Sequence, residues 1–385
     1  MTKKKKIICI ILVTLFVLIG CGGVAVYGML HDVLQNDLDV NNLNINPDLA
    51  ESGIKNIAIF GIDGREEDGE FIGDRSDAIL IASCNFDTGE VKVVSFMRDL
   101  MVEIADTEVS DAYLTKINSA FAFGGVEAQI ATLNKNFDLN IEDYVVVNFD
   151  CMIDVVDTLG GVDVNIVDEE MEYWVDCYIG TIIEITGKTS AAVPGTGWQH
   201  LNGVQTLAYC RNRYSDSDYG RTARQREVVT KIAEKAMDAD LLTILNLMRK
   251  VYPYVTTSLS ISEMTELATA YLSMENKTIE TSRVPFDTIN TTGTVDELSF
   301  VLPTSLADNV KVLHYLFYGD ANYTPSDTVQ NISDSIINYT GYGSTMYLTP
   351  AEILSNTSLD ESTYTGDDSS TAGDSDADLD ADSEE

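Results

Sequence analysis

The sequence has few positive charges, few histidines and few cysteines. Its 385 residues include 24 Lys and Arg against 62 Asp and Glu, a formal net charge of −38 at pH 7. This deficit of cations excludes a general nucleic-acid binder, because binding to phosphate backbones needs clustered positive charge. Three histidines, with His31 and His200 in unsuitable contexts, argue against a histidine-activated nucleophile. Six scattered cysteines without a CxxC pair exclude a disulfide-rich miniprotein and leave a zinc site without a framework.

The N-terminal segment contains a long apolar stretch without a charged residue. Lys3 to Lys6 form a basic tetrad, and residues 7–30, IICIILVTLFVLIGCGGVAVYGML, contain no charge. Twenty-four helical residues extend about 36 Å, enough to cross a hydrocarbon core of about 30 Å. The sequence therefore predicts a transmembrane helix at 7–30. Because positive flanks stay inside, residues 1–6 are expected in the cytoplasm and the remainder outside the cell membrane.

Two cleavable segments are the alternatives to this anchor. A secretory signal peptide would have a shorter apolar core followed by polar chain. A lipoprotein signal is the closer rival, because Leu18-Ile19-Gly20-Cys21 resembles a lipobox. The apolar run continues to Leu30, past the position where a lipidated mature terminus turns polar, and this favours the uncleaved anchor.

The opposite end has a different composition. Residues 360–385 contain eleven Asp and Glu and no Lys, Arg or His. Like-charge repulsion and the scarcity of apolar side chains leave little to offset the entropy of ordering, so the tail is expected to be disordered from about residue 360. We predict a juxtamembrane linker at 31–52, a main domain at 53–320 and a polar, acidic C-terminal extension at 321–385.

The main domain alternates strand-like and helix-like patterns, which predicts a layered α/β fold. Strands are expected at 56–63, 78–86, 91–99, 143–149, 161–167 and 278–286. Helices are expected at 126–134, 152–159, from residue 222 onward and at 262–274. Residues 168–200 have no clear pattern and are expected to be irregular. Residues 201–213 are expected to form a short helix that leads into a strand.

Arginines are concentrated in three places. The chain has ten, and eight of them form clusters that stand out in so acidic a protein: Arg65 and Arg75; Arg98; and Arg211, Arg213, Arg221, Arg224 and Arg226. If Arg211 and Arg213 lie on a strand, they point to the same face. Paired guanidinium groups suit a phosphate or pyrophosphate, and a following helix N-terminus also favours an anion. Structural bridges to surface carboxylates are the alternative explanation.

Two aspartates accompany the first arginine cluster. Asp63 ends one expected strand and Asp77 begins the next, within GIDGREEDGEFIGDRSDAIL. Carboxylates at the ends of neighbouring strands can share one Mg²⁺ or Mn²⁺, the hard cations that accompany phosphate transfer. Turn-capping acids are the alternative, and they explain Glu66, Glu67, Asp68 and Glu70.

These motifs resemble the LytR–CpsA–Psr family. The resemblance covers about residues 53–320 and rests on NIAIFGIDGR, GDRSDAILIASCNFDTGEVKVVSFMRD, KINSAFAFGG and LNGVQTLAYCRNRYSDSDYGRTARQ, in family order. It implies an α/β/α sandwich with a central mixed sheet and an apolar pocket for a prenyl chain. It also implies an extracytoplasmic phosphotransferase that moves a glycopolymer (teichoic acid, capsule or another secondary polymer) from a polyprenyl-pyrophosphate carrier to peptidoglycan.

The resemblance also assigns residues by motif. Asp63 and Asp77 correspond to the metal-binding aspartates. The pyrophosphate-contacting set comprises Arg65, Arg75, Arg98, Arg211, Arg213, Arg221 and Gln225, with Lys116 and Arg224 as supporters. Asp99 is expected to be a base or an orienting group. Met97 replaces a usual proline and Ser119 a frequent histidine, which affects geometry more than charge.

The sequence leaves the acceptor open. The same site with water as acceptor would be a polyprenyl-pyrophosphate hydrolase, and a protein that holds lipid-linked polymer without turnover would be a binding or regulatory protein. Cys151 with Cys177 is the one cysteine pair to test for a disulfide, whereas Cys84 and Cys210 are expected to be buried thiols.

Overall fold

The structure is a computed structural model that describes residues 38–49, 53–62, 75–106, 111–215, 218–239, short runs between 243 and 263, 278–344 and 346–356. The expected membrane anchor at 7–30 and the acidic tail from 360 lie outside these residues. The expected helix at 262–274 lies almost wholly outside them too. Among the helices that are described, none is both long and apolar enough to cross a membrane.

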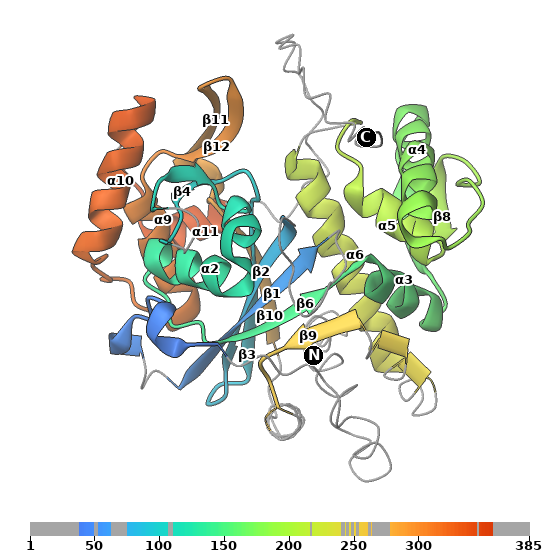
Figure 1. Cartoon of the computed structure of the whole chain (residues 1–385), viewed down its shortest axis with the longest axis horizontal. Helices are drawn as coiled ribbons and strands as arrows, with labels where there is room; N and C mark the ends of the chain where they lie inside the picture. Colours follow the sequence, from blue (N-terminus) through green and yellow to red (C-terminus); the bar gives the residue numbers. More distant parts are fainter. Residues whose placement is uncertain are drawn as a thin grey trace, which may run out of the picture.

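A six-stranded mixed sheet forms the centre of the molecule (Figure 1). Its strands, in spatial order, are β10 (Thr278–Val284), β3 (Glu90–Phe96), β2 (Ser76–Asn85), β1 (Ile54–Ile62), β6 (Asp143–Val147) and β9 (Val255–Thr257). β10 pairs with β3 and β1 pairs with β6 in parallel, while the other pairs are antiparallel. The expected strands at 56–63, 78–86, 91–99, 143–149 and 278–286 correspond to these elements within a few residues.

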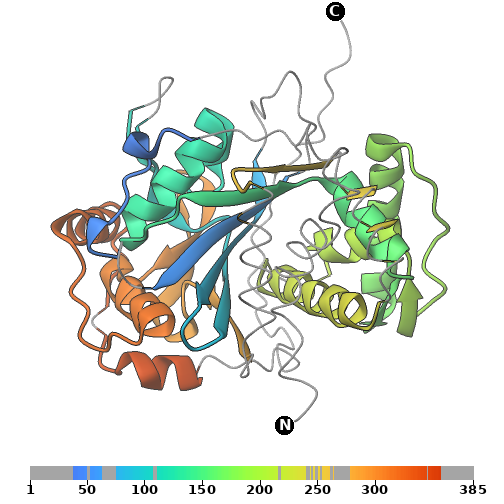
Figure 2. The ribbon, with the colours of Figure 1, turned by 90° about the horizontal axis from the view of Figure 1, so that it is seen from below.

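Helices lie on both sides of this sheet (Figures 1 and 2). One side carries α2 (Ser119–Phe137), α9 (Leu306–Tyr318), α10 (Asp327–Thr340) and α11 (Pro350–Asn356). The other side carries α3 (Phe149–Thr158), α4 (Glu169–Thr186), α5 (Gly203–Arg211) and α6 (Asp218–Asp238). α2 is kinked at Gly124 and Gly125, which have non-helical dihedral angles, so the expected helix at 126–134 is its second segment.

Three two-stranded sheets and three short 3₁₀ helices complete the described fold. The strand pairs are β4 (Met101–Glu103) with β5 (Leu114–Lys116), β7 (Val162–Ile166) with β8 (Gly197–Leu201), and β11 (Asn290–Val295) with β12 (Leu298–Pro303). The 3₁₀ helices are η2 (Val40–Asn42), η3 (Pro47–Leu49) and η5 (Asp287–Ile289).

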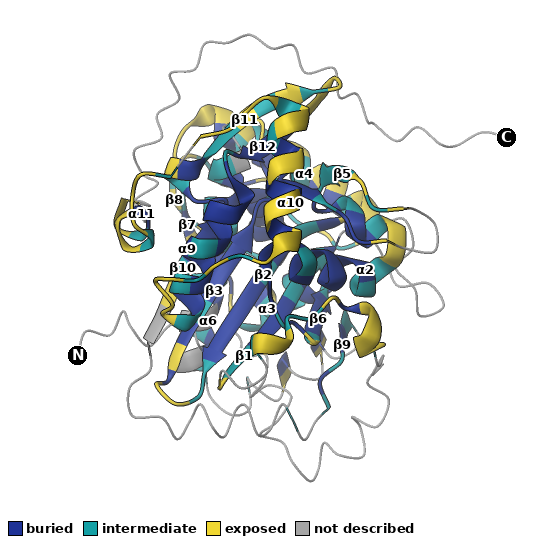
Figure 3. Cartoon of the chain, turned by 90° about the vertical axis from the view of Figure 1, so that its left-hand side faces the viewer, coloured by how far each residue is buried: buried dark blue, intermediate teal, exposed yellow. Residues whose placement is uncertain are grey.

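The apolar interior of the described residues has two large clusters and a small one, which joins Cys151 to Leu247 and Val251. The first core joins one face of the sheet, for example Phe60, Ile81 and Val94, to α2, α9, α10 and α11. The second core joins α3, α4, α5 and α6 to β7 and β8, and within the described part of the chain it includes no residue of the six-stranded sheet. Figure 3 shows the buried central strands and the exposed outer face of α10. Strand side chains alternate between faces, so the sheet presents a second face toward the α3–α6 layer.

The C-terminal extension begins with folded chain. Val329, Ile332 and Ile336 of α10 and Ile353 of α11 are buried in the first core. These helices follow the boundary that we expected at residue 320, and they pack on the same body as β1 and α9.

Two expectations from the sequence are wrong. Residues 168–200 are not irregular, because they contain the 18-residue helix α4 and most of β8. Residues 209–213 do not form a strand: Asn202 caps α5 in a capping box with Gln205, the helix continues to Arg211, and a loop follows. The capping box at Asn202 stabilises the start of the helix, and the helix continues through Tyr209 and Cys210 although these residues favour strands.

Candidate active site

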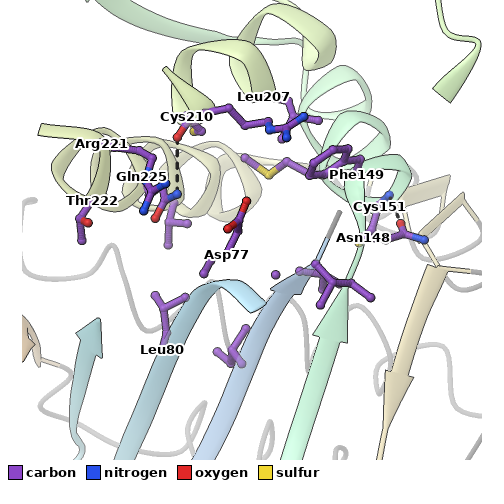
Figure 4. A pocket seen from close by; sticks show the side chains of 18 of the residues that line it. Asp77, Leu80, Asn148, Phe149, Cys151, Leu207, Cys210, Arg221, Thr222 and Gln225 are labelled. Carbon is purple, nitrogen blue, oxygen red and sulfur yellow. Dashed lines mark hydrogen bonds between the residues drawn. The ribbon is translucent and has the colours of Figure 1, made fainter. Parts of the chain in front are cut away.

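A β-bulge positions Asp77 at the edge of the sheet. Gly61 pairs with Ala78 and Ile62 pairs with Ser76, so Asp77 is an extra residue on β2. A bulge leaves its extra residue outside the regular pairing and redirects the side chain. The Ser76 hydroxyl donates to Gln129 of α2, 3.0 Å away, on the side of the first core. Asp77 instead lines the space toward α5 and α6, as Figure 4 shows.

Strand register brings Arg98 to Asp77. Ile79 pairs with Phe96 at the end of the antiparallel β2–β3 ladder, so Asp77 and Arg98, two positions beyond each, lie near one another. The Nη1 atom of Arg98 donates to Oδ1 of Asp77 over 2.6 Å. On its other side, Nε of Arg98 lies 3.5 Å from Oδ2 of Asp99, and Nζ of Lys116 lies 3.0 Å from Oδ1 of Asp99. Two carboxylates and two cations thus alternate along a chain that starts at the bulge.

Both carboxylates in this chain are held in the ionised form. Burial of Asp77 acts to raise its pKa, but the charges of Arg98, Arg221 and Arg211 and the hydrogen bond from Arg98 together lower it below the usual value. Burial opposes ionisation of Asp99 in the same way, and Arg98, Lys116 and Arg221 lower its pKa. The guanidinium groups therefore act on the carboxylates from two layers, the sheet edge and the helices above it.

The remaining guanidinium groups come from α5, its following loop and α6. Arg211 is the last residue of α5 and its guanidinium lies 4.6 Å from the Phe149 ring centroid. Arg213 follows in the loop. Arg221 and Gln225 lie one turn apart on α6 and therefore share a face. Figure 4 shows Arg221 and Gln225 beside Asp77, with the Gln225 amide donating to the carbonyl oxygen of Cys210 over 3.4 Å.

Arg224 supports this arrangement from within the protein. Arg224 is 5% exposed and Arg221, on the same helix, is 4% exposed. The Nε atom of Arg224 donates to the carbonyl oxygen of Tyr209 over 3.1 Å, and Nη2 donates to the carbonyl oxygen of Asn212. These bonds fasten the end of α5 and the following loop to α6, so Arg224 positions Arg211 and Arg213.

A cavity of about 760 Å³ extends from these charges between the sheet and the α3–α6 layer. Ile59, Leu80 and Val93 line it from the strands. Met152, Val155, Leu159, Val229, Ile232, Ala236 and Leu247 line it from the opposite side. Its charged lining residues are four arginines (Arg98, Arg211, Arg213 and Arg221) and one aspartate (Asp77), a net charge of +3 in a chain of net charge −38. The space is thus largely apolar, with one cationic end.

The fold and the arrangement of motifs agree with known proteins. A model of the LytR_cpsA_psr family matches residues 28–312. The chain belongs to this family.

The LytR_cpsA_psr protein is also similar to individual relatives and solved structures. It is 33% identical over 280 residues to the polyisoprenyl-teichoic acid–peptidoglycan teichoic acid transferase TagU of Bacillus cereus (strain AH820), which covers 70% of this chain and 84% of the relative. Its fold matches protein gbs0355 from Streptococcus agalactiae with a TM-score of 0.60 at 23% identity, covering 76% of this chain and 96% of the other. B. subtilis TagV matches with a TM-score of 0.52 at 25% identity, covering 71% and 100%. The mixed α/β fold that the family resemblance implied is confirmed.

Not every residue that the resemblance assigned in this LytR_cpsA_psr protein lies in the cavity wall. Arg98, Arg211, Arg213, Arg221, Gln225 and Asp77 line it. Three further residues do not line the cavity but support those that do. Asp99 contacts Arg98 and Lys116, and Arg224 donates to the backbone between Arg211 and Arg213. Arg75 is exposed and is not among the lining residues, and its charge acts on Tyr113. Asp63 and Arg65 lie outside the described residues.

The expected metal site can be tested at one of its two ligands. The ionised Asp77 carboxylate is an oxygen donor of the kind that Mg²⁺ prefers, and Mg²⁺ is commonly held by one or two carboxylates plus substrate phosphates and water. Among the described residues, no group of three or more His, Cys, Asp and Glu could hold a metal by itself. Asp77 therefore fits a metal that is shared with a phosphate ligand.

The sequence reasoning missed the aromatic residues of the site. Phe149, Trp174, Tyr178 and Tyr214 line the cavity near the arginines. Trp174 and Tyr178 lie on α4, which was expected to be irregular. A helical signal was present: Asp168 caps the N-terminus, Gly187 follows the C-terminus, and Met171, Val175, Ile179 and Ile182 recur at helical spacing and are buried.

The four described cysteines are free thiols. Cys84, Cys151 and Cys210 are buried and Cys177 is exposed. Burial raises the pKa of Cys84, Cys151 and Cys210 to about 12, so these thiols stay protonated at neutral pH. The expectation that Cys84 and Cys210 are buried is confirmed, and Cys151 is not bonded to Cys177 in this structure.

Proposed function

We propose that this protein transfers a glycopolymer from a polyprenyl-pyrophosphate carrier to peptidoglycan and forms a phosphodiester link. The observation that carries the proposal is the apolar cavity with a cationic end. An amphiphile with a long hydrocarbon chain and a pyrophosphate group matches both parts. Its chain would be buried in the apolar space, and its pyrophosphate would accept bidentate hydrogen bonds from the arginines. The TagU relative, a polyisoprenyl-teichoic acid–peptidoglycan teichoic acid transferase, supports this choice.

The arginines bind and orient the pyrophosphate in this proposal. Arg98, Arg211, Arg213 and Arg221, with Arg65 and Arg75 from the first cluster, neutralise its oxygens, and Gln225 adds an amide donor. A sugar hydroxyl of peptidoglycan attacks the phosphorus on the polymer side. The new oxygen–phosphorus bond forms as the bond to the bridging oxygen breaks, polyprenyl phosphate leaves, and the hydroxyl proton is released. Positioning and charge neutralisation supply the rate enhancement, as is general in phosphoryl transfer.

Asp77 and Asp99 have different roles in this reaction. A Mg²⁺ or Mn²⁺ ion held by Asp77 together with Asp63 would add positive charge beside the pyrophosphate. Asp99 does not line the cavity, and its lowered pKa makes it a weak base. Its contacts with Arg98 and Lys116 make it an orienting residue that holds the guanidinium of Arg98 in place.

We further propose a single-pass membrane protein. Residues 7–30 would anchor it, residues 1–6 would remain in the cytoplasm, and the folded domain would lie on the extracytoplasmic side, where peptidoglycan is found. The basic tetrad before an uncharged stretch of 24 residues supports this orientation.

The test uses the full-length protein in detergent with a radiolabelled polyprenyl-pyrophosphate saccharide and Mg²⁺, with and without peptidoglycan. Acceptor-dependent label in the glycan is the expected result for the wild type. Arg211→Ala and Asp77→Ala should each lower the rate about 10²- to 10³-fold, the usual effect of losing one preorganised charged group. Lys235→Ala removes a cation from the same helix as Arg221 but outside the cavity wall, and should leave the rate unchanged.

Three other outcomes would contradict the transferase. Release of polyprenyl phosphate at the same rate without peptidoglycan would show a hydrolase. Retention of intact lipid without turnover would show a binding or regulatory protein. Full transfer by both Arg211→Ala and Asp77→Ala would show that the site lies elsewhere.

A further inference from the structure

Three aromatic side chains form a stacked platform at the cationic end of the cavity. The rings of Trp174 and Tyr214 are stacked with centroids 4.4 Å apart and planes inclined by 28°. Tyr178 stacks against Tyr214 at 6.2 Å and 24°. All three side chains line the cavity. We call these three residues the aromatic platform.

The platform is built from two fixed segments. Trp174 and Tyr178 are one turn apart on α4 and so project from the same face of that helix. Tyr214 lies in the loop after α5, where the Asn212 side chain accepts a hydrogen bond from the Tyr214 amide over 3.2 Å. The Asn212 side chain also donates to Ser215 over 2.7 Å, and the backbone carbonyl oxygen of Asn212 accepts from Arg224. α4 and α5 pack side by side (Figure 1), so the rings are held in place before any ligand arrives.

The platform contributes little to the protein interior. Tyr214 is 53% exposed, and neither Trp174 nor Tyr214 belongs to the second core, against which Tyr178 is only partly packed. Aromatic rings that stack on one another in a cavity wall and stay partly exposed leave faces available to a ligand. Packing of the described core therefore does not account for these rings.

The neighbouring charges show what kind of ligand would reach the platform. The Arg211 guanidinium lies 5.8 Å from the Tyr178 ring centroid and that of Arg213 lies 5.9 Å from the Tyr214 centroid. A ligand that places its chain in the apolar cavity and its pyrophosphate on these arginines must continue into the first sugar. That sugar would therefore lie next to Arg211 and Arg213, where the rings of Tyr178 and Tyr214 are found.

We infer that the aromatic platform binds the first pyranose rings of the donor saccharide, next to the pyrophosphate. The C–H face of a pyranose is apolar and slightly positive, so it packs on the negative face of an aromatic ring. This assignment rests on the proposed function, since it requires a lipid-linked saccharide. It gives the platform a role in recognising the polymer, separate from the arginines that recognise the phosphates.

The chain offers a direct optical readout. It contains two tryptophans, Trp174 and Trp198. Trp198 is 71% exposed on β8 and does not line the cavity, so Trp198→Phe leaves Trp174 as the sole indole reporter. The fluorescence of Trp174 in this full-length variant is titrated with polyprenyl pyrophosphate, with the same lipid carrying a disaccharide, and with a soluble peptidoglycan saccharide.

The saccharide-bearing lipid should bind more tightly than bare polyprenyl pyrophosphate and should change Trp174 emission further. Tyr214→Ala should remove this gain, weakening the saccharide lipid about 5- to 10-fold while leaving the bare lipid unchanged, as expected for one lost ring contact. Tyr214→Phe keeps the ring and should keep the gain. Tyr347→Ala, which removes a 92% exposed tyrosine outside the cavity wall, is the matched control.

The outcomes separate this inference from the proposed function. An equal gain in Tyr214→Ala and wild type, with bare lipid bound normally, would overturn the platform and leave the lipid site intact. Tighter binding of the peptidoglycan saccharide than of the donor disaccharide at Trp174 would assign the platform to the acceptor instead. If the wild type bound neither lipid, the proposed function would fail and the inference with it.

Discussion

At the scale of single residues, the site depends on a bulge that adds one residue to β2. Without it, Asp77 would fall in the regular alternation of β2 and would share a face with Ile79, which is buried in the first core. The bulge instead allows the carboxylate to reach Arg98 and face the helices that carry Arg211 and Arg221. Ionised Asp77 and Asp99 also hold Arg98 between them, so its guanidinium is oriented before a phosphate arrives.

The Asp77–Arg98 pair makes a prediction about stability and pH. The pKa of Asp77 is lowered in the folded protein, so the pair stabilises the fold above the unfolded-chain value of about 3.9 and this contribution is lost as pH falls through the lower, folded-state pKa. Arg98→Gln should therefore reduce the free energy of unfolding at pH 7 by about 1–3 kcal/mol, the usual worth of a charged hydrogen bond. Urea titrations from pH 7 to pH 3 measure the difference.

The difference between wild type and Arg98→Gln should shrink as pH falls below 4. Lys311→Gln is the control, because Lys311, which lies 2.8 Å from Asp308, is 38% exposed against 15% for Arg98, so its loss should cost less than about 1 kcal/mol. A penalty for Arg98→Gln that stayed constant down to pH 3 would show that its cause is packing rather than charge.

The sequence shows the identity of these residues better than their geometry. The clustering of arginines in an acidic chain is visible in the sequence, and Asp77 is visible because it begins an expected strand. The bulge is not visible, because it depends on how β1 and β2 align. Arg224 holds the loop and Arg221 lines the cavity. This difference in role depends on which side of α6 faces α5, and the sequence does not show it. The expectation that Arg211 and Arg213 share a strand face failed because both were placed on the wrong element.

At the scale of elements, α5 depends on close contact with α3. A Cβ atom added to Gly203 at the start of α5 would lie 2.4 Å from the carbonyl oxygen and 2.7 Å from the Cα of Ile153. These backbone atoms cannot shift away without moving the helix, whereas a flexible side chain could change its rotamer. The absence of a side chain at residue 203 therefore sets the distance between the two helices, and with it the place of Arg211 at the far end of α5.

Gly203→Ala should force α5 away from α3. We expect a loss of about 1–3 kcal/mol in the free energy of unfolding, the usual cost of overpacking, and a reduced transfer rate because Arg211 moves. Gly180→Ala is the matched control. Gly180 lies within α4 and an added Cβ would meet nothing within 4 Å, so alanine should stabilise the helix by up to about 1 kcal/mol. Thermal unfolding of both variants measures the effects, and equal shifts would refute this account of Gly203.

Helix α4 shows how local signals compete. Its sequence has a polar cap, apolar residues at helical spacing and a closing glycine, yet Trp174, Tyr178 and several β-branched residues favour a strand or a loop by propensity. Burial of one face against α5 and β7 decides the outcome. That burial depends on elements distant in sequence, so the position of Trp174 and Tyr178 beside Tyr214 could not be predicted from their own segment.

At the scale of the whole molecule, the cavity divides the two cores. The first core is continuous with the sheet, whereas the α3–α6 layer faces the sheet across an apolar space. Elements with fewer packed neighbours open locally at lower free energy than a continuous core. A lipid in the cavity would supply the missing contacts and stabilise the protein by mass action.

Hydrogen exchange should reveal this division. Amides of α3 and α6 should exchange faster than those of β1, β2 and α9 in the lipid-free protein, and polyprenyl pyrophosphate should slow the α3 and α6 amides most. Leu80→Trp fills part of the cavity from β2, so it should abolish most of this slowing, whereas the volume-conserving Leu80→Met should keep it. Uniform protection in both layers, with or without lipid, would contradict a cavity that divides the cores.

The packing of α10 and α11 on the first core has a practical consequence for anyone who shortens this chain. The family match ends at residue 312, in the middle of α9, and a gene cut there would delete half of a buried helix and all of the two that cover it. The newly bared apolar surface would drive self-association during expression. A soluble recombinant fragment should therefore extend at least to Asn356, where the last described helix ends.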